Sequence, residues 1–129
     1  MSTKSTSQIE AAACDVVTRF HRDIMGRGPR SVTATLQKNM LFIHLEGVLT
    51  KAETTLVSAS GDHQPRNIEV VREMRHHLVH QARNDLLAAL SGTIGMRADG
   101  MMHDIDPMTS SEVLVFHLAD EPQSARRPA

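Results

Sequence analysis

Residues 31–46, SVTATLQKNMLFIHLE, decide the fold that this sequence predicts. Apolar residues take every second position of 31–37 and again of 40–46, which is the period of a strand with one buried face: Val32, Ala34, Leu36, Leu41, Ile43 and Leu45. Lys38 and Asn39, which lie between the two segments, suffice for a tight turn. We therefore predict that the two strands form an antiparallel β-hairpin.

A helix is predicted before the hairpin. Its apolar residues recur at steps of three and four, which gives one buried stripe: Ile9, Ala13, Val16, Phe20 and Ile24. Gly26, Gly28 and Pro29 then end the helix, because glycine tolerates the left-handed conformation of a last turn and proline prevents continuation. The segment GRGPRS, residues 26–31, is interpreted as a joint between helix and strand.

Further elements are expected after the hairpin. Thr50 and Glu53 have the spacing of a capping box, so a short helix is predicted over about 51–59. Pro65 suits the start of a long helix over 66–91, which Ser91 and Gly92 would end. A strand over 93–99, a polar loop over 100–111 and a strand over 112–118 complete the chain, and the last strand is apolar on both faces apart from His117.

The order α-β-β-α-α-β-β favours an α+β two-layer sandwich, with a four-stranded, largely antiparallel sheet and helices on one face. Residues 8–119 are expected to form one domain, because the 129-residue chain contains no linker or internal repeat. The polar ends, residues 1–7 and 120–129, are predicted to be disordered tails.

Composition excludes several function classes. The chain has three Phe, no Trp, no Tyr and a net charge of −1, so neither stacking on nucleic-acid bases nor an electrostatic nucleic-acid surface is expected. No apolar stretch approaches the length of a membrane span, so direct membrane insertion is not expected. A single cysteine, Cys14, favours a reducing compartment and a cytoplasmic location.

Two groups of residues are candidates for ligand binding. Arg27 and Arg30 in the GRGPRS joint could hold a small anion, although a loop that follows a helix lies near the negative end of the helix dipole. His44, Arg97 and His117 would share the outer face of the sheet if both histidines point away from the helices. That face is either a ligand site or, as we favour, the interface of a homodimer, because a bare apolar sheet face is costly to expose.

Two histidine-containing segments are candidates for metal binding. His76 and His80 are one helical turn apart, which is the reach of a shared metal ion. The wheel nevertheless places them opposite the core, so a solvent-exposed helix face is the favoured interpretation. His103, Asp104 and Asp106 fall together in the predicted loop, where aspartate is also a common turn residue. No catalytic triad, paired CxxC or phosphate-binding loop is present, and no cofactor is predicted.

The segments GRGPRSVTATLQKNMLFIHLEGVLTKAETTL and VREMR resemble the bacterial MpsC-like family, named after the third component of a sodium-translocating, membrane-potential-generating system. The resemblance covers roughly residues 8–118, and the loosely matching DIDP and EVLVFHL belong to it. The matching positions are Gly26, Gly28, Pro29, Ser31, Val32, Gly47, Leu49, Thr50, Glu53, Leu56, Val70 or Val71, Arg72 and Glu73. The histidines at 44, 76, 77, 80 and 117 are not part of the family pattern.

The resemblance implies a soluble accessory protein linked to sodium or proton flux and to inorganic-carbon uptake. The leading hypothesis is a non-enzymatic regulatory module that acts by binding protein, as a homodimer and with a membrane transporter as a possible partner. The second hypothesis is a small-anion or metal sensor. The third is a small enzyme that uses the His103–Asp106 segment as acid and base.

Overall fold

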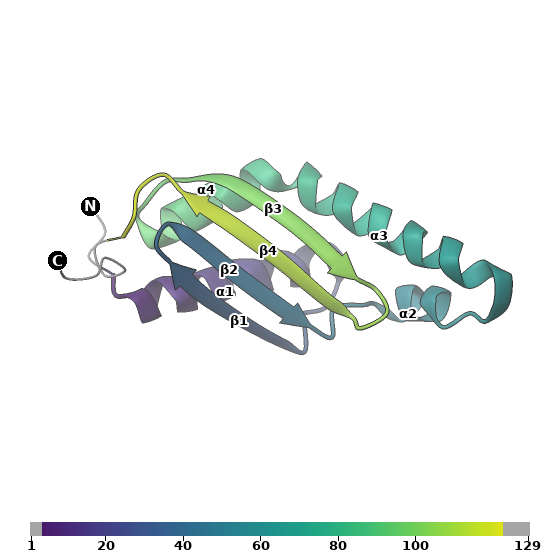
Figure 1. The fold of residues 1–129 in the computed structure, drawn as a ribbon. Helices are drawn as coiled ribbons and strands as arrows, with labels where there is room; N and C mark the ends of the chain where they lie inside the picture. The colour runs from purple at the N-terminus through teal and green to yellow at the C-terminus, as the bar shows by residue number, and fades with distance from the viewer. Residues whose placement is uncertain (1–3, 123–129) are drawn as a thin grey trace.

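The computed structural model describes residues 4–122, and these form two layers (Figure 1). The elements follow in the order α1 (Thr6–Met25), β1 (Ser31–Gln37), β2 (Met40–Glu46), α2 (Lys51–Val57), the 3-10 turn η1 (Gly61–His63), α3 (Gln64–Gln81), α4 (Arg83–Ile94), β3 (Ala98–Asp106) and β4 (Ser111–Leu118). The predicted α+β sandwich and the order of its helices and strands are confirmed.

One antiparallel sheet forms the first layer, with strand order β1-β2-β4-β3. The predicted hairpin of β1 and β2 is present, with Gln37 paired to Met40 across the turn. Helices α1 and α4 lie behind the sheet in Figure 1, while α3 runs beside the edge strand β3 and extends past the sheet together with α2. In the part of the chain that the structure describes, no element covers the opposite face of the sheet.

The core lies between the sheet and the helices. Many of its fully buried members come from the inner faces of β2 and β4 and from α1 and α4, among them Val17, Leu41, Ile43, Leu45, Leu90, Ile94, Leu114 and Phe116. The buried face of α1 is rotated relative to the predicted stripe. Ile24, a member of that stripe, is exposed, whereas Val17 and His21, which lie outside it, are buried. Helix α1 also begins at Thr6, within the predicted tail, because Ser5 and Gln8 form a capping box. The predicted tail residues 1–3 and 123–129 lie outside the described range.

The single long helix predicted over 66–91 is wrong. The chain turns at Ala82, whose φ of −89° and ψ of 4° separate α3 from α4. Gly92 does not end a helix but lies inside α4, which ends at Gly95 in the left-handed conformation, with φ of 72°.

The strand predicted over 93–99 and the loop over 100–111 are also misplaced. Residues 93–94 belong to α4, and most of the predicted loop is β3. In β3, His103 and Ile105 point into the core while Met102, Asp104 and Asp106 are exposed. Asp104 and Asp106, whose polarity suggested a loop, therefore lie on the solvent-facing side of an edge strand.

Candidate functional site

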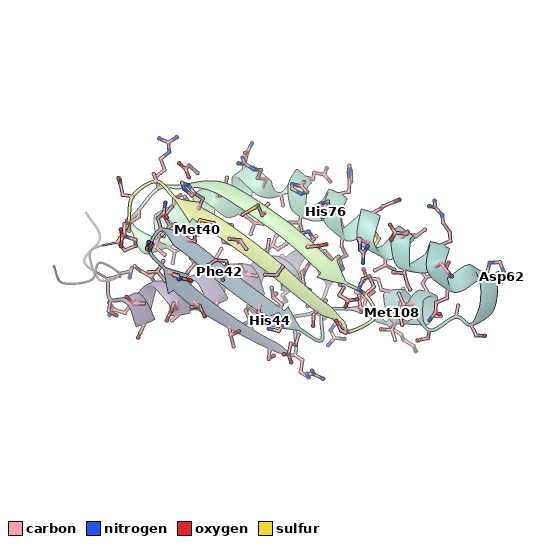
Figure 2. The ribbon with its side chains drawn as sticks, in the orientation of Figure 1. Met40, Phe42, His44, Asp62, His76 and Met108 are labelled. Atoms are coloured by element: carbon pink, nitrogen blue, oxygen red, sulfur yellow. The ribbon has the colours of Figure 1, made fainter. Side chains whose placement is uncertain are left out.

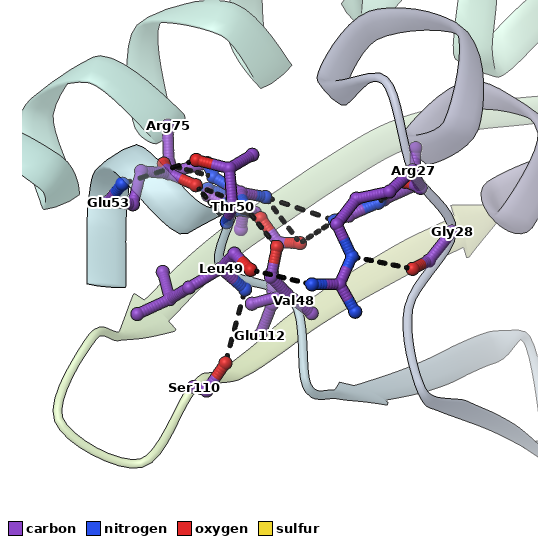
Figure 3. Close-up of polar contacts among 11 residues, drawn as sticks. Arg27, Gly28, Val48, Leu49, Thr50, Glu53, Arg75, Ser110 and Glu112 are labelled. Atoms are coloured by element: carbon purple, nitrogen blue, oxygen red, sulfur yellow. Dashed lines mark hydrogen bonds and ion pairs between the residues drawn. The ribbon is translucent and has the colours of Figure 1, made fainter. Parts of the chain in front are cut away.

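A buried ionic network lies where α2, α3 and β4 meet (Figure 3). Arg75 of α3 is fully buried, and its guanidinium forms a fork with the carboxylate of Glu53 on α2. Nε donates to Oε2 and Nη2 to Oε1, both at 2.7 Å, and Nη2 also donates to the Val48 carbonyl oxygen. A charge-assisted bidentate pair of this kind fixes both side chains in one geometry.

The Glu53 carboxylate is held from both sides. Its Oε1 accepts the Thr50 backbone N–H at 2.8 Å, while the Thr50 hydroxyl accepts the Glu53 N–H, so the predicted capping box is present. Burial alone would raise the pKa of Glu53, but the bonds and charge of Arg75 and the bonds from Thr50 outweigh it and lower that pKa. Glu53 is therefore a permanent anion of the network.

His21 of α1 extends the network to the first helix. Its Nδ1 lies 2.6 Å from the carbonyl oxygen of Arg27, and its Nε2 lies 3.1 Å from Nη1 of Arg75. A neutral ring meets both contacts, with Nδ1–H donating to the carbonyl and Nε2 accepting from the guanidinium. Burial lowers the pKa of His21; the bond to the Arg27 carbonyl opposes this, and the Arg75 charge adds to the lowering.

Glu112 of β4 connects Arg75 to a group of histidines. Its Oε1 lies 3.7 Å from Nη1 of Arg75, and its Oε2 lies 2.6 Å from Nε2 of His103 on β3. Glu112 and His103 are both buried. The sequence suggested a last strand that is apolar on both faces, whereas Glu112 belongs to its buried face because it alternates with Leu114 and Phe116.

Three imidazoles gather at the end of this chain of contacts. His76 Nδ1 lies 3.0 Å from His103 Nδ1, and the His80 ring lies with its centroid 4.7 Å from that of His76. His76 is half-buried and so departs from the solvent-facing prediction, whereas His80 is exposed as predicted. Burial and the neighbouring charges of His76 and His103 lower the pKa of His80.

The remaining metal candidates lie elsewhere. Asp104 and Asp106 alternate with His103 and Ile105 along β3, so they point to the opposite face of the sheet from His103. Over residues 4–122, no group of three or more histidine, cysteine, aspartate or glutamate side chains stands ready to hold a metal ion as the rings now lie. The fold therefore brings His76, His80 and His103 together and leaves Asp104 and Asp106 apart from them.

The arginines of the GRGPRS joint bond to the protein itself. The Arg27 guanidinium donates to the carbonyl oxygens of Leu49 at 3.2 Å and of Gly28 at 3.4 Å (Figure 3). Arg30 pairs with Glu46 at 3.3 Å, and both side chains are exposed. These contacts tie the joint to the ends of β2 and the following segment.

The outer face of the sheet forms a regular grid, because the register is unbroken except at a shift between Ala98 and Gly100 near the start of β3. Two rows at its centre cross the sheet, as the pairing of residues shows: Thr35–Phe42–Val115–Met102 and Thr33–His44–Val113–Asp104. We call the first of these the apolar row. It runs across the middle of the exposed face, and Met40, Phe42 and His44 follow one another along β2 on that face in Figure 2.

His44 and His117 both lie on this outer face, but they do not form one site. His44 pairs with Val113 and His117 with Met40, so the two are four residues apart along the strands, roughly 13 Å. His117 is instead 2.5 Å from Asp99, and that hydrogen bond lowers the pKa of Asp99. His44 lies 3.9 Å from Glu46. Arg97, just before β3, is exposed.

One pocket of about 330 Å³ lies beside the buried network. Its lining carries both signs of charge: His44, Arg72, Asp104, Asp106, Glu112 and Val113. Arg72 Nε is buried there without a hydrogen-bond partner among the described residues, although its Nη1 donates to Glu69. A lining of mixed charge gives the pocket no preference for a simple anion.

Sequence reasoning missed His21, Arg75 and Glu112 as site residues. The sequence nevertheless contained a sign of each. Each residue lies on the helix stripe or strand face that its buried apolar neighbours define. Arg75 is four residues from Val71 and from Val79, and both valines are buried. A charged side chain on a buried stripe requires a partner, but the partner lies on another element and the sequence does not reveal it.

Comparison with known proteins agrees with the motifs. The family model described as "Na+-translocating membrane potential-generating system (MpsC)" matches residues 5–120. The uncharacterised protein YbcI of Bacillus subtilis (strain 168) is 25% identical over 118 residues, which cover 92% of this chain and 91% of that protein. No solved structure matches.

The described residues contain no helix that is long and apolar enough to cross a membrane. The buried Glu53 and the joint glycines that carried the resemblance are within the matched residues. The matched range extends from the cap of α1 to just beyond β4 and thus includes every helix and strand of the fold. This chain belongs to the MpsC family.

Proposed function

We propose that this domain is a non-enzymatic accessory module that acts by binding protein, and that its outer sheet face pairs two copies into a homodimer. The observation that carries the proposal is the apolar row. Phe42 is 39% exposed and Met102 is 59% exposed at the middle of a face that no described element covers. Contiguous exposed apolar surface of this kind marks an interaction site.

A second copy is the occupant that we favour. The apolar side chains of the row, Phe42, Val115 and Met102, match those of a second copy in chemistry. A two-fold axis parallel to the rows places one apolar row against the other near the centre of the interface. It also brings the row that carries Met40 and His117 over the row of the second copy that carries His44 and Asp104.

The buried network supports a structural role instead of a catalytic one. Arg75 and Glu53 are buried and paired with each other, and Arg75 also faces the buried Glu112, so the charges of the network are used within the fold. Together they fix α2 and α3 against the end of the sheet. A rigid domain with one open face suits a binding module.

Family membership supports a link to a cation-translocating system and, by resemblance, to inorganic-carbon uptake. We propose that the domain works in the cytoplasm and meets the membrane through a transporter partner. Affinity capture from detergent-solubilised membranes of the native host tests this link. A cation-translocating membrane protein retained by the wild type supports it, and recovery of no membrane protein contradicts it.

Dimerisation is tested by a matched pair of methionines. Met102 lies in the apolar row at 59% exposure, and Met108 lies at the β3–β4 turn at 57% exposure (Figure 2). In sedimentation velocity, the wild type and Met108→Glu should sediment as dimers, and Met102→Glu should sediment as a monomer. A monomeric wild type, or equal behaviour of the two variants, would contradict the proposal.

A further inference from the structure

Three histidines cluster where α3 contacts β3, and this cluster has no role in the proposed function. His76 and His80 come from one face of α3, and His103 reaches them from the inner face of β3. The three ring centroids are 4.7, 5.1 and 6.5 Å apart. Imidazoles from two different elements therefore converge at one point beneath the edge of the sheet.

The orientation of His103 is fixed by its carboxylate partner. Its Nε2 lies 2.6 Å from Oε2 of Glu112, so this nitrogen carries the proton and donates it to the carboxylate. In the neutral ring, Nδ1 then presents a lone pair toward His76. A carboxylate that holds the far N–H of a histidine is the common second partner of a metal-binding imidazole, because it fixes the tautomer and raises the basicity of the ligand.

We propose that His76, His80 and His103 form a binding site for a divalent transition-metal ion of the Zn²⁺ class, with Glu112 holding His103 in its ligating orientation. The Nδ1 atoms of His76 and His103 are 3.0 Å apart. Two nitrogens bound to one tetrahedral Zn²⁺ are roughly 3.3 Å apart. Zn²⁺ would replace the hydrogen between them: the His76 ring would carry its proton on Nε2 instead of Nδ1, and both rings would turn so that their Nδ1 lone pairs meet at one ion.

His80 supplies the third ligand by rotation of its side chain. It is exposed and lies one helical turn from His76, the spacing with which two histidines of a helix share a metal ion. A fourth position remains open on the solvent side.

The donor set decides the class of ion. Three imidazole nitrogens suit Zn²⁺, Co²⁺, Ni²⁺ and Cu²⁺, whereas Ca²⁺ and Mg²⁺ require oxygen ligands. Asp104 and Asp106, the nearest oxygen donors along β3, point to the other face of the strand. Metal binding would join α3 to the edge of the sheet and thereby reinforce a contact that the buried network already makes.

Cobalt titration tests the site, with protein that carries no polyhistidine tag. Tetrahedral Co²⁺ should give visible d–d bands that saturate at one ion per chain, and Zn²⁺ should displace it. His76→Ala should weaken binding by at least about 100-fold, because loss of even a second partner of a ligand weakens metal binding by about 10–100-fold. His77→Ala, an exposed neighbour on the same helix, should bind like the wild type.

His103 is buried, so its variant needs a second measurement. His103→Gln should abolish the tetrahedral spectrum while circular dichroism remains that of a folded chain. For the wild type, ¹⁵N-detected spectra of the histidine rings should show Zn²⁺ bound at Nδ1 of both His76 and His103. Absence of bands from the wild type, bands that survive His76→Ala, or binding that needs the helix histidines but not His103 would each overturn the site.

Discussion

Removal of the Arg75 side chain is the most informative test of the buried network. Arg75→Met keeps much of the volume but removes the cation that faces Glu53 at 2.7 Å and Glu112 at 3.7 Å. Both carboxylates stay buried, with side chains 3% exposed, and lose the guanidinium that they face. Arg72→Met is the matched control, since Arg72 lies one turn earlier in the same helix and pairs with exposed Glu69 at 3.3 Å.

The two variants should differ widely in the free energy of unfolding. Breaking a buried ion pair by removing one partner costs about 3–5 kcal/mol, because a charge is left buried without compensation. Breaking an exposed pair costs about 0.2–1 kcal/mol. Domains have a total stability of about 5–15 kcal/mol, so Arg75→Met should remove about a fifth or more of it.

Urea denaturation followed by circular dichroism measures the difference. With a slope of about 1–3 kcal/mol per molar urea, Arg75→Met should lower the midpoint by roughly 2 M, and Arg72→Met by less than about 0.5 M. A double variant, Arg75→Met with Glu53→Leu, should recover part of the loss, because one uncompensated charge is also removed. Equal midpoints for Arg75→Met and Arg72→Met would refute the assignment of Arg75 as the centre of the network.

Three other predictions concern pH and two glycines. The fold lowers the pKa of His21, so the unfolded chain binds a proton at this residue more readily than the folded chain. The contribution of His21 to stability should therefore be complete above the ordinary histidine pKa of 6.5. It should be lost as the pH falls from 6.5 toward the lower pKa of the folded state. Between about pH 7 and pH 5, the unfolding temperature should therefore fall less for His21→Gln than for the wild type. Equal falls for the two proteins would contradict a neutral His21 ring. At Gly47, with φ of +64°, an added Cβ would lie 2.6 Å from the Arg30 Cβ, so Gly47→Ala should destabilise by at least about 1–2 kcal/mol. Gly92→Ala, inside α4 with nothing within 4 Å of the new Cβ, should instead stabilise by about 0.5–1 kcal/mol, and denaturation midpoints that move in the same direction would contradict this account.

Local signals were sufficient for three of the four strands, because the last strand, predicted over 112–118, is also present as β4. The β1–β2 hairpin was predictable because its alternation and its turn lie within 16 consecutive residues, 31–46. Strand β3 was not, because its outward residues Asp104 and Asp106 are polar and the Ile94–Met96–Ala98 alternation just before it imitates a strand. Alternation alone does not reveal that Gly95 ends a helix in the left-handed conformation.

The site was less predictable than the fold. The capping pair Thr50 and Glu53 was visible because both partners lie in one turn of helix. The second role of Glu53, as the partner of Arg75 across 22 positions of sequence, is a tertiary contact. The same holds for His76 and His103, which lie 27 positions apart and meet only because α3 packs along β3.

The most direct measurement of the proposed function is cross-linking at the centre of the outer face. Val115→Cys places a thiol in the apolar row, and Val70→Cys places one on α3, where Val70 is 37% exposed; both variants carry Cys14→Ser. Two sheets packed face to face lie about 10 Å apart. A short bis-maleimide should therefore join two copies through position 115 and leave the position 70 variant monomeric on a denaturing gel. Failure to link through position 115, or equal linking through both positions, would contradict a dimer that forms through the sheet.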